Sequence, residues 1–159
     1  MSKYFYTPLS TSIGWIGLLA SDKGLRRLVL PKPSAQQAVD ELWPETDTAE
    51  LAPARFHRFQ EQLEEYLSGD AVSFDLELDT EGYSDFFSKA WTACSSIPRG
   101  ETRSYTWLAV QAGRPRAIRT AGQAMARNPI PIVIPCHRVI GTDGRLHGYG
   151  GGLGLKQHL

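Results

Sequence analysis

The sequence predicts an α/β protein in two parts, a small α/β domain over residues 1–82 and a mainly helical domain over residues 83–159. Strand-like segments and turn residues fill the first third, and helical spacing of apolar residues dominates the second domain. The charge changes at nearly the same place. Residues 1–85 carry 7 Lys/Arg and 15 Asp/Glu, a net charge of −8, and residues 86–159 carry 10 and 2, a net charge of +8. A chain of 159 residues has room for both domains.

The first domain is expected to contain an antiparallel sheet. The segment Asp22-Lys23-Gly24 supplies a turn between two of its strands. Its strand-like segments are residues 3–7, 14–21, 25–30 and 72–78.

Two helices complete the first domain. Ser34 can cap a helix over residues 35–43, which Pro44 ends, and residues 44–53 are expected to form a loop. Ser68-Gly69 closes the second helix. The apolar residues of that helix recur at helical spacing: Phe56, Phe59, Leu63 and Leu67. We find no candidate site in this domain.

The second domain begins with a helix that Ser84 can cap and that Pro98 and Gly100 end. Cys94 lies on its apolar face, so the simplest interpretation makes this cysteine a core residue. The residues of that face are Phe86, Phe87, Ala90, Trp91 and Cys94.

Two further helices, over residues 105–113 and 115–128, are separated by a turn at Gly113 and resemble a helix-turn-helix. Pro115 suits the first turn of the second helix, and Asn128-Pro129 stops it. Small residues and three arginines make this helix thin and basic: Arg116, Ala117, Arg119, Ala121, Gly122, Ala124, Ala126 and Arg127. Such a helix could approach DNA closely, even in the minor groove, or it could simply pack tightly in the protein.

The basic charge of the second domain has two interpretations as well. It could neutralise the acidic first domain across an interface, or it could bind an anionic polymer, for which arginine suits phosphate geometry. Eight of the ten cations are arginines: Arg99, Arg103, Arg114, Arg116, Arg119, Arg127, Arg138 and Arg145.

The most unusual segment places Cys136, His137 and Arg138 side by side after the apolar run "IPIVIPC". This run is expected to form a strand that ends at Cys136. Because successive side chains of a strand point to opposite faces, the thiol and imidazole would touch only if the backbone turns at Cys136 or a water joins them. Arg138 adds a positive potential that favours the thiolate. The glycine-rich "GYGGGLG" that follows lacks the Gly-Lys-Ser/Thr ending of a phosphate-binding loop.

Composition excludes several classes of protein. No apolar stretch approaches the roughly 20 residues that span a bilayer, and the first residues lack the apolar core of a signal peptide. We therefore expect a cytoplasmic protein that does not bind membranes and whose two cysteines are free thiols. Neither a CxxC motif nor a Cys/His cluster predicts a metal site, and we expect no cofactor.

Five linked segments between residues 86 and 156 resemble the O6-alkylguanine-DNA alkyltransferases, or methylated-DNA–protein-cysteine methyltransferases. They are "IPRGETRSY", "GRPRAIRTAG", "NPIPIVI", "IPCHRV" and "GYGGGLGLK". The opening "TPLSTSIGWIGLLASDKGLRRLVL" matches more loosely. The resemblance implies an RNase H-like α/β N-terminal domain and a mainly helical, winged-helix-like C-terminal domain with a DNA-binding helix-turn-helix.

The resemblance also implies the reaction and its residues. Cys136 would take the alkyl group from O6-alkylguanine, and from O4-alkylthymine, in duplex DNA, once per molecule, because the thioether product is not hydrolysed. His137 resembles the base that removes the thiol proton through a water. Tyr105 resembles the residue that rotates the adjacent phosphate and gives a proton to the leaving base. Asn128 resembles the residue that joins the helix-turn-helix to the cysteine segment.

DNA and substrate contacts follow from the same resemblance. Arg119 is similar to the finger that replaces the flipped nucleotide in the stack. The other DNA contacts through the minor groove are implied for Ala117, Thr120, Gly122 and Arg127. The base pocket is implied for Met125, Val139, Tyr149 and Gly150. Lys156 resembles a lysine that fixes the glycine-rich loop, and the protein is expected to act as a monomer.

The sequence departs from the family pattern in three places. The sequence ends at Leu159, before the position of a glutamate that orients the histidine in family members. Gly150 stands where some relatives have a serine that binds O6, so only its backbone N–H could serve. Ile118 and Thr120 are bulkier than the alanines often found beside the arginine finger.

Three other interpretations remain open. Alkyltransferase-like proteins bind damaged bases without an acceptor cysteine, which the presence of Cys136 argues against. A cysteine hydrolase would need an oxyanion hole in addition to Cys136 and His137. In a purely structural protein, Cys136 would be a core residue.

Overall fold

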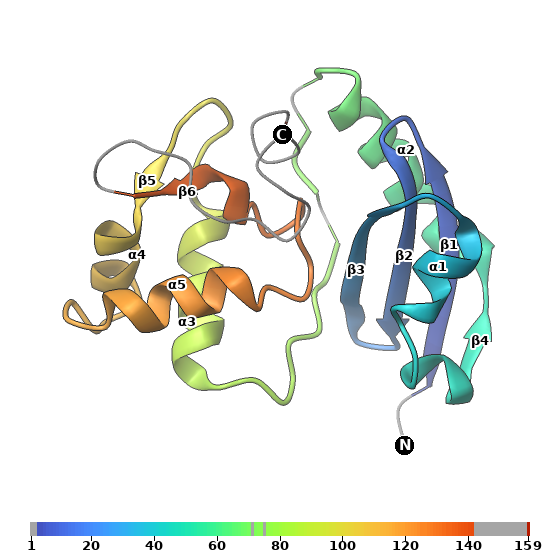
Figure 1. The fold of residues 1–159 in the computed structure, drawn as a ribbon, viewed down its shortest axis with the longest axis horizontal. Coiled ribbons are helices and arrows are strands. Elements are labelled where there is room, and N and C mark those ends of the chain that lie inside the picture. The colour runs from blue at the N-terminus through green and yellow to red at the C-terminus, as the bar shows by residue number, and fades with distance from the viewer. Residues whose placement is uncertain (1–2, 71, 75, 142–158) are drawn as a thin grey trace. The chain divides into compact units, whose positions relative to one another are not determined.

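The computed structural model describes residues 3–70, 72–74, 76–141 and 159. The chain divides into two units, Met1–Asp79 and Thr80–Leu159, the first built around a sheet and the second mainly helical (Figure 1). This is the two-part α/β architecture that the sequence predicts. The exact boundary at residues 82 and 83 stays a prediction.

A four-stranded sheet in the order β3-β2-β1-β4 forms the first unit. Its strands are β1 Tyr4–Thr11, β2 Gly14–Ser21, β3 Gly24–Lys32 and β4 Ala49–Leu51. The first three are antiparallel, whereas β4 runs parallel to β1, so the expectation of an antiparallel sheet is wrong at this edge. The expected loop over residues 44–53 is also wrong, because it contains β4 and the 3-10 helix η1, Glu45–Thr48. Strand β4 has only three residues, too few to show the alternation of apolar and polar residues by which a strand is predicted.

Helices α1, Ala35–Asp40, and α2, His57–Leu67, complete this unit. The Ser34 side chain accepts a hydrogen bond from the backbone N–H of Gln37, as expected of an N-cap, but α1 ends at Asp40 and not at Trp43. The preceding 3-10 helix η2, Pro53–Phe56, runs into α2. The core of this unit includes Leu19, Val29 and Leu42, all buried.

The strand expected over residues 72–78 is not formed by its described residues. They are irregular except for one bridge between Leu78 and Leu25. Buried Asp79 then accepts a hydrogen bond from Ser21 and lies 3.2 Å from the guanidinium of Arg26. The end of this segment is therefore held by side-chain contacts of Asp79 and by two backbone hydrogen bonds to Leu25, from the Leu25 N–H to the Glu77 carbonyl and from the Asp79 N–H to the Leu25 carbonyl.

The second unit is mainly helical and adds one short parallel strand pair, β5-β6. Its elements are α3 Asp85–Ser95, β5 Arg103–Ser104, α4 Tyr105–Gln111, α5 Ile118–Ala126, the 3-10 helix η3 Cys136–Arg138 and β6 Val139–Ile140. Ser84 caps α3 as predicted, and Ser104 caps α4 by accepting from the N–H of Trp107. Trp91 of α3 donates its indole N–H to the carbonyl of Ala124 on α5, at 2.8 Å.

Two expectations for the second unit are wrong. The helix expected from Pro115 begins at Ile118, because the N–H of Ala117 bonds to the carbonyl of Arg114 and closes a turn first. The strand expected over residues 130–136 is a turn. Ile132 has a φ of 76° there, and the Ile134 N–H bonds to the Ile130 carbonyl.

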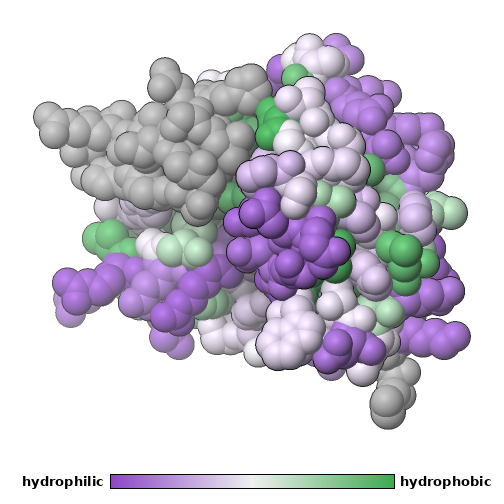
Figure 2. Space-filling view, turned by 45° about the vertical axis from the view of Figure 1, so that its right-hand side comes forward, coloured by the Kyte–Doolittle hydropathy of each residue, from purple (hydrophilic) through white to green (hydrophobic). Residues whose placement is uncertain are grey.

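The described surface carries few large hydrophobic side chains. On the face shown in Figure 2, hydrophobic residues form small separate groups among hydrophilic ones. Exposed large hydrophobics in the described ranges include Val110 of α4 and Ile118 of α5. None of the helices in the described ranges is both long and apolar enough to span a bilayer.

Candidate active site

Cys136 and His137 occupy the same short 3-10 turn, η3. The Arg138 N–H bonds to the Pro135 carbonyl at 2.9 Å, and the Cys136 N–H to the Ile134 carbonyl at 2.7 Å. Because the backbone turns here, the alternation of a strand no longer separates the thiol from the imidazole. Both residues are 6% exposed. A backbone turn at Cys136 was one of the two arrangements that would allow the thiol and the imidazole to interact, and the structure has this turn.

Asn128 connects the end of α5 to this turn. Its Nδ2 donates to the Ile134 carbonyl at 2.8 Å, and its Oδ1 accepts from the Ile130 N–H at 2.9 Å. One side chain thus bonds the backbone at two places, Ile130 and Ile134, in the segment where a strand was expected. A paired side-chain amide can replace the ladder bonds that a strand would have made.

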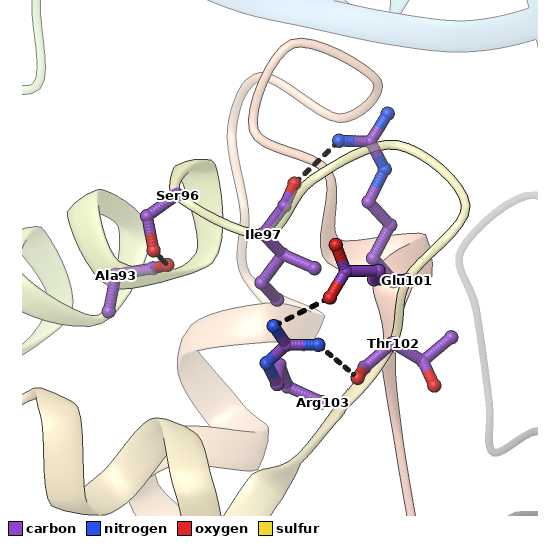
Figure 3. A network of polar contacts seen from close by, with 7 residues as sticks. Ala93, Ser96, Ile97, Glu101, Thr102 and Arg103 are labelled. Carbon is purple, nitrogen blue, oxygen red and sulfur yellow. Dashed lines mark hydrogen bonds and ion pairs between the residues drawn. The ribbon is translucent and has the colours of Figure 1, made fainter.

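Arg138 connects the turn to the end of α3. Its Nη1 donates to the carbonyl of Ile97 at 2.8 Å, and the Ile97 N–H bonds to the Cys94 carbonyl at 3.1 Å. The loop that follows α3 has further polar contacts, shown in Figure 3: Ser96 donates to the Ala93 carbonyl, and Arg103 reaches the Glu101 carboxylate and the Thr102 carbonyl.

A cluster of buried or half-buried titratable groups surrounds the turn. Burial raises the pKa of the Cys94 thiol, the charge of Cys136 raises it too, and the Arg138 guanidinium opposes both. Burial also raises the pKa of the Tyr105 hydroxyl, with smaller contributions from Cys136 and Cys94. These effects mean that Cys94 stays protonated at neutral pH and is a poor nucleophile. Cys94 is fully buried, in agreement with its predicted place in the core.

Two residues implied for the base pocket are buried in the second unit. Val139 begins β6 and is fully buried, and Met125 on α5 is 6% exposed. Tyr105, the first residue of α4, is half-buried. A Cβ built on Gly122 would lie 4.0 Å from Cδ1 of the Tyr105 ring, so the ring passes close to this face of α5.

Apart from Tyr105, which begins α4, the predicted DNA-contacting residues lie on α5 or at its ends. Arg119 and Arg127 are exposed, and Thr120, Gly122 and Ala117 are half-buried. Ala117 lies at the N-cap position and Arg127 at the C-cap. Among the described residues, no ion pair engages Arg119 or Arg127, so their charges remain available to an anion. Tyr149, Gly150, Lys156 and the turn predicted over residues 142–144 lie outside the described residues.

Two features of the site were not found from the sequence. The bond from Arg138 to Ile97 joins residues 41 positions apart and leaves no local pattern. The Ser104 cap had a signal, since a serine directly preceding a helical run is a typical N-cap. Among the described residues, no group of three or more His, Cys, Asp or Glu side chains could hold a metal ion.

The fold and the site together define a class. Its members have two units, a mixed sheet first in the chain and a helical unit second. In the helical unit, a buried cysteine and a buried histidine share a turn that follows the helix-turn-helix in the chain.

Comparisons with known proteins identify the family. Residues 4–80 match the 6-O-methylguanine DNA methyltransferase, ribonuclease-like domain, and residues 85–159 match the DNA binding domain of the same proteins. The methylated-DNA–protein-cysteine methyltransferase of Methanosarcina barkeri is 44% identical over 155 residues, which cover 98% of this chain and 94% of that one. The Mycolicibacterium paratuberculosis protein of that name is 43% identical, over 97% of this chain and 88% of its own.

Solved structures agree with this assignment. Mycobacterium tuberculosis OGT in complex with DNA matches with a TM-score of 0.80 and 38% identity, over 96% of this chain and 88% of that one. This chain therefore belongs to the methylated-DNA–protein-cysteine methyltransferase family. Its activity is transfer of a methyl group from DNA to a protein cysteine, which is DNA repair by direct reversal of damage.

Proposed function

We propose that Cys136 is the acceptor of this reaction and that its substrates are O6-alkylguanine and O4-alkylthymine in duplex DNA. The Cys136 thiolate attacks the alkyl carbon, the S–C bond forms as the C–O6 bond breaks, and the electron pair passes to guanine, which takes up a proton. His137 removes the thiol proton through a water. The thioether is not hydrolysed, so each molecule acts once.

The observation that carries this proposal is the turn that Cys136 shares with His137, which Asn128 joins to the end of α5. An alkyl acceptor must meet a base delivered by the DNA-binding helix, so a bonded connection from that helix to the thiol is the feature the reaction needs. The other cysteine, Cys94, is sealed in the core with a raised pKa, which disfavours it as an acceptor.

A base inside a duplex is out of reach, so the nucleotide must be flipped out. We propose that α5 enters the minor groove and that Arg119 takes the place of the extruded base. Its guanidinium is exposed and forms no ion pair with another described residue, which supports this role because arginine both stacks and donates hydrogen bonds. The groove contacts are assigned to Ala117, Thr120, Gly122 and Arg127.

Tyr105 rotates the adjacent phosphate and gives a proton to the leaving base. The phenol is protonated at neutral pH, as a proton donor requires, and burial raises its pKa further. We assign the walls of the base pocket to Met125, Val139, Tyr149 and Gly150, and the fixing of the glycine-rich loop to Lys156. We propose that the protein works as a monomer and in the cytoplasm.

Intact-protein mass spectrometry after incubation with duplex DNA containing one O6-methylguanine tests the proposal. We expect one added methyl group per molecule, which peptide mapping places on Cys136 and not on Cys94. Cys136→Ser should abolish the adduct and keep binding to the damaged duplex. A methyl group on Cys94, or continued gain beyond one group per molecule, would refute the assignment.

A second candidate is a recognition module that binds damaged bases without transfer. The buried thiol of Cys136 beside His137 argues against it. Absence of any adduct, together with tighter binding to the damaged than to the undamaged duplex, would establish that alternative instead.

A further inference from the structure

Arg138 holds the cysteine turn on the end of helix α3. Its Nη1 donates to the Ile97 carbonyl at 2.8 Å, and Ile97 is 2% exposed, so the acceptor belongs to the fixed interior of the unit. Ile97 is itself bonded to α3 through the Cys94 carbonyl. A hydrogen bond between a cation and a buried carbonyl is stronger than one between neutral groups.

The loop between α3 and α4 contacts the cysteine turn at a second place. Arg103 and Ser104 of β5 pair with Val139 and Ile140 of β6, which directly follow Arg138. The turn is therefore held after Cys136 by the Arg138 bond and by a strand pair, and before Cys136 by Asn128. Among these contacts, the Arg138 bond is the one made by a charged side chain.

No carboxylate of the described residues forms an ion pair with Arg138. Among the described residues, its guanidinium takes part in no ion pair, and its hydrogen bond goes to a neutral carbonyl. An arginine paired with Asp or Glu would present almost no net charge to its surroundings, whereas this one keeps its full positive field. That field reaches the buried thiols, because Arg138 lowers the pKa of Cys94 against the effect of burial.

We propose that Arg138 is a positioning residue for the methyl-transfer reaction: anchored on the Ile97 carbonyl, it fixes the turn that carries Cys136 and supplies the positive charge that favours the Cys136 thiolate. The inference rests on the proposed function of Cys136. Among the described residues, the titratable groups that interact with Cys136 are Cys94 on α3 and Tyr105 on α4, and His137 lies on the same turn. Cys94 and Tyr105 have raised pKa values and stay neutral, so neither adds a negative charge that would oppose that of Arg138.

The test measures alkylation of Cys136 by iodoacetamide between pH 5 and 9 in the full chain, with peptide mapping to separate Cys136 from Cys94. Arg138→Gln keeps an amide donor for the Ile97 carbonyl and removes the charge. Arg138→Lys keeps the charge and loses the planar guanidinium. Arg99→Gln, at an exposed position two residues after Ile97, is the matched control.

We expect the midpoint of the Cys136 pH profile to rise by about one pH unit in Arg138→Gln, which makes alkylation below the midpoint roughly tenfold slower. Arg138→Lys should restore most of this shift, and Arg99→Gln should leave the midpoint in place. A wild-type midpoint in Arg138→Gln, or equal shifts in the Gln and Lys variants, would overturn the role of charge. If Arg138→Gln does not fold by circular dichroism, Arg138→Met, which also removes the charge, takes its place: a midpoint raised by about one pH unit supports the proposal and a wild-type midpoint overturns it.

Iodoacetamide needs no DNA, so this result is independent of methyl transfer. If wild type fails to take a methyl group from DNA, the proposed function fails whatever the midpoints are. If it does take one and the midpoints do not move, only the role of Arg138 fails.

Discussion

The Asn128 side chain and the Ile134 carbonyl are joined by a hydrogen bond of 2.8 Å, two residues before Cys136. The other end of the same amide accepts from the Ile130 N–H. Asn128 follows the C-cap residue of α5, Arg127, so the position of the thiol depends on the end of the helix that is proposed to enter DNA. A small displacement of a reacting group is costly in rate, because it removes the alignment that the fold provides.

Asn128→Ala should therefore reduce both stability and methyl transfer. The substitution removes two hydrogen bonds and leaves the backbone groups of Ile130 and Ile134, both buried residues, without these partners. We expect the free energy of unfolding to fall by about 1–3 kcal/mol. Urea denaturation and the single-turnover rate on O6-methylguanine duplex measure the two effects.

Gln123→Ala is the control for the Asn128 substitution, because Gln123 is an exposed amide on α5 itself. It should change the free energy of unfolding by less than about 0.5 kcal/mol. If Asn128→Ala transfers methyl at the wild-type rate, the link between α5 and Cys136 has no part in the reaction.

Arg119→Ala should slow repair of duplex DNA while leaving the chemistry of the thiol intact. The guanidinium is exposed and forms no ion pair in the described part of the chain, so its loss breaks no ion pair there. We expect slower transfer from duplex DNA, and an unchanged rate of Cys136 alkylation by iodoacetamide. Lys89→Ala is the control, since Lys89 is an exposed cation on α3 that is already paired with Asp85. Equal losses with both reagents would mean that Arg119 supports the fold and not base flipping.

The helices were the most predictable part of this fold. The spacing of Phe86, Ala90, Trp91 and Cys94 predicted the buried face of α3, and Ser84 marked its start. Amphipathic spacing and caps are local signals, so a sequence carries them in full. The adjacent residues Cys136 and His137 are also a local signal, so the sequence alone could indicate the candidate site.

The segments held by distant partners could not be predicted. Residues 130–136 have the apolar composition of a strand, but the bonds of Asn128 and the positive φ of Ile132 turn the backbone. Strand β4 exists because it pairs with β1, more than 40 positions earlier in the chain. The bond from Arg138 to Ile97 likewise depends on tertiary packing. Such contacts are decided by the whole fold and not by local propensity.

Cys94 should make the stability of the protein fall at alkaline pH. Its folded-state pKa is raised, first by burial and then by the charge of Cys136, so the folded chain keeps a proton that the unfolded chain loses above about pH 8.5. The stabilisation is complete below that pH and declines as pH rises, by up to about 1.4 kcal/mol per pH unit. Tyr105, whose pKa is also raised, adds to this decline only above about pH 10.

Cys94→Ala tests this dependence in urea denaturation with reductant at pH 7, 9 and 10. The variant should be less stable at pH 7 by about 1 kcal/mol, because it leaves a small cavity in the core. The difference from wild type should then shrink as the pH rises. A constant difference across this range would show that Cys94 does not resist ionisation in the folded chain.

Substitution by alanine should raise the free energy of unfolding at Gly122 and lower it at Gly17. On α5, a Cβ at Gly122 meets only the Tyr105 ring at 4.0 Å, an ordinary contact, so Gly122→Ala should stabilise the helix by about 0.5–1 kcal/mol. On β2, a Cβ at Gly17 would lie 2.7 Å from the Ala38 carbonyl oxygen of α1. Gly17→Ala must push α1 away from the sheet and should destabilise by about 1–3 kcal/mol.

The affinity for duplex DNA should rank these two variants in the opposite order to their stability. If α5 enters the narrow minor groove as proposed, the added methyl of Gly122→Ala should weaken duplex binding even though the protein is more stable. Gly17→Ala lies in the other unit and should bind the duplex with wild-type affinity below its melting temperature. Fluorescence anisotropy with a labelled duplex measures both affinities. Wild-type affinity in Gly122→Ala would mean that this face of α5 does not touch DNA, and the groove contact would then have to be made by another face of the helix.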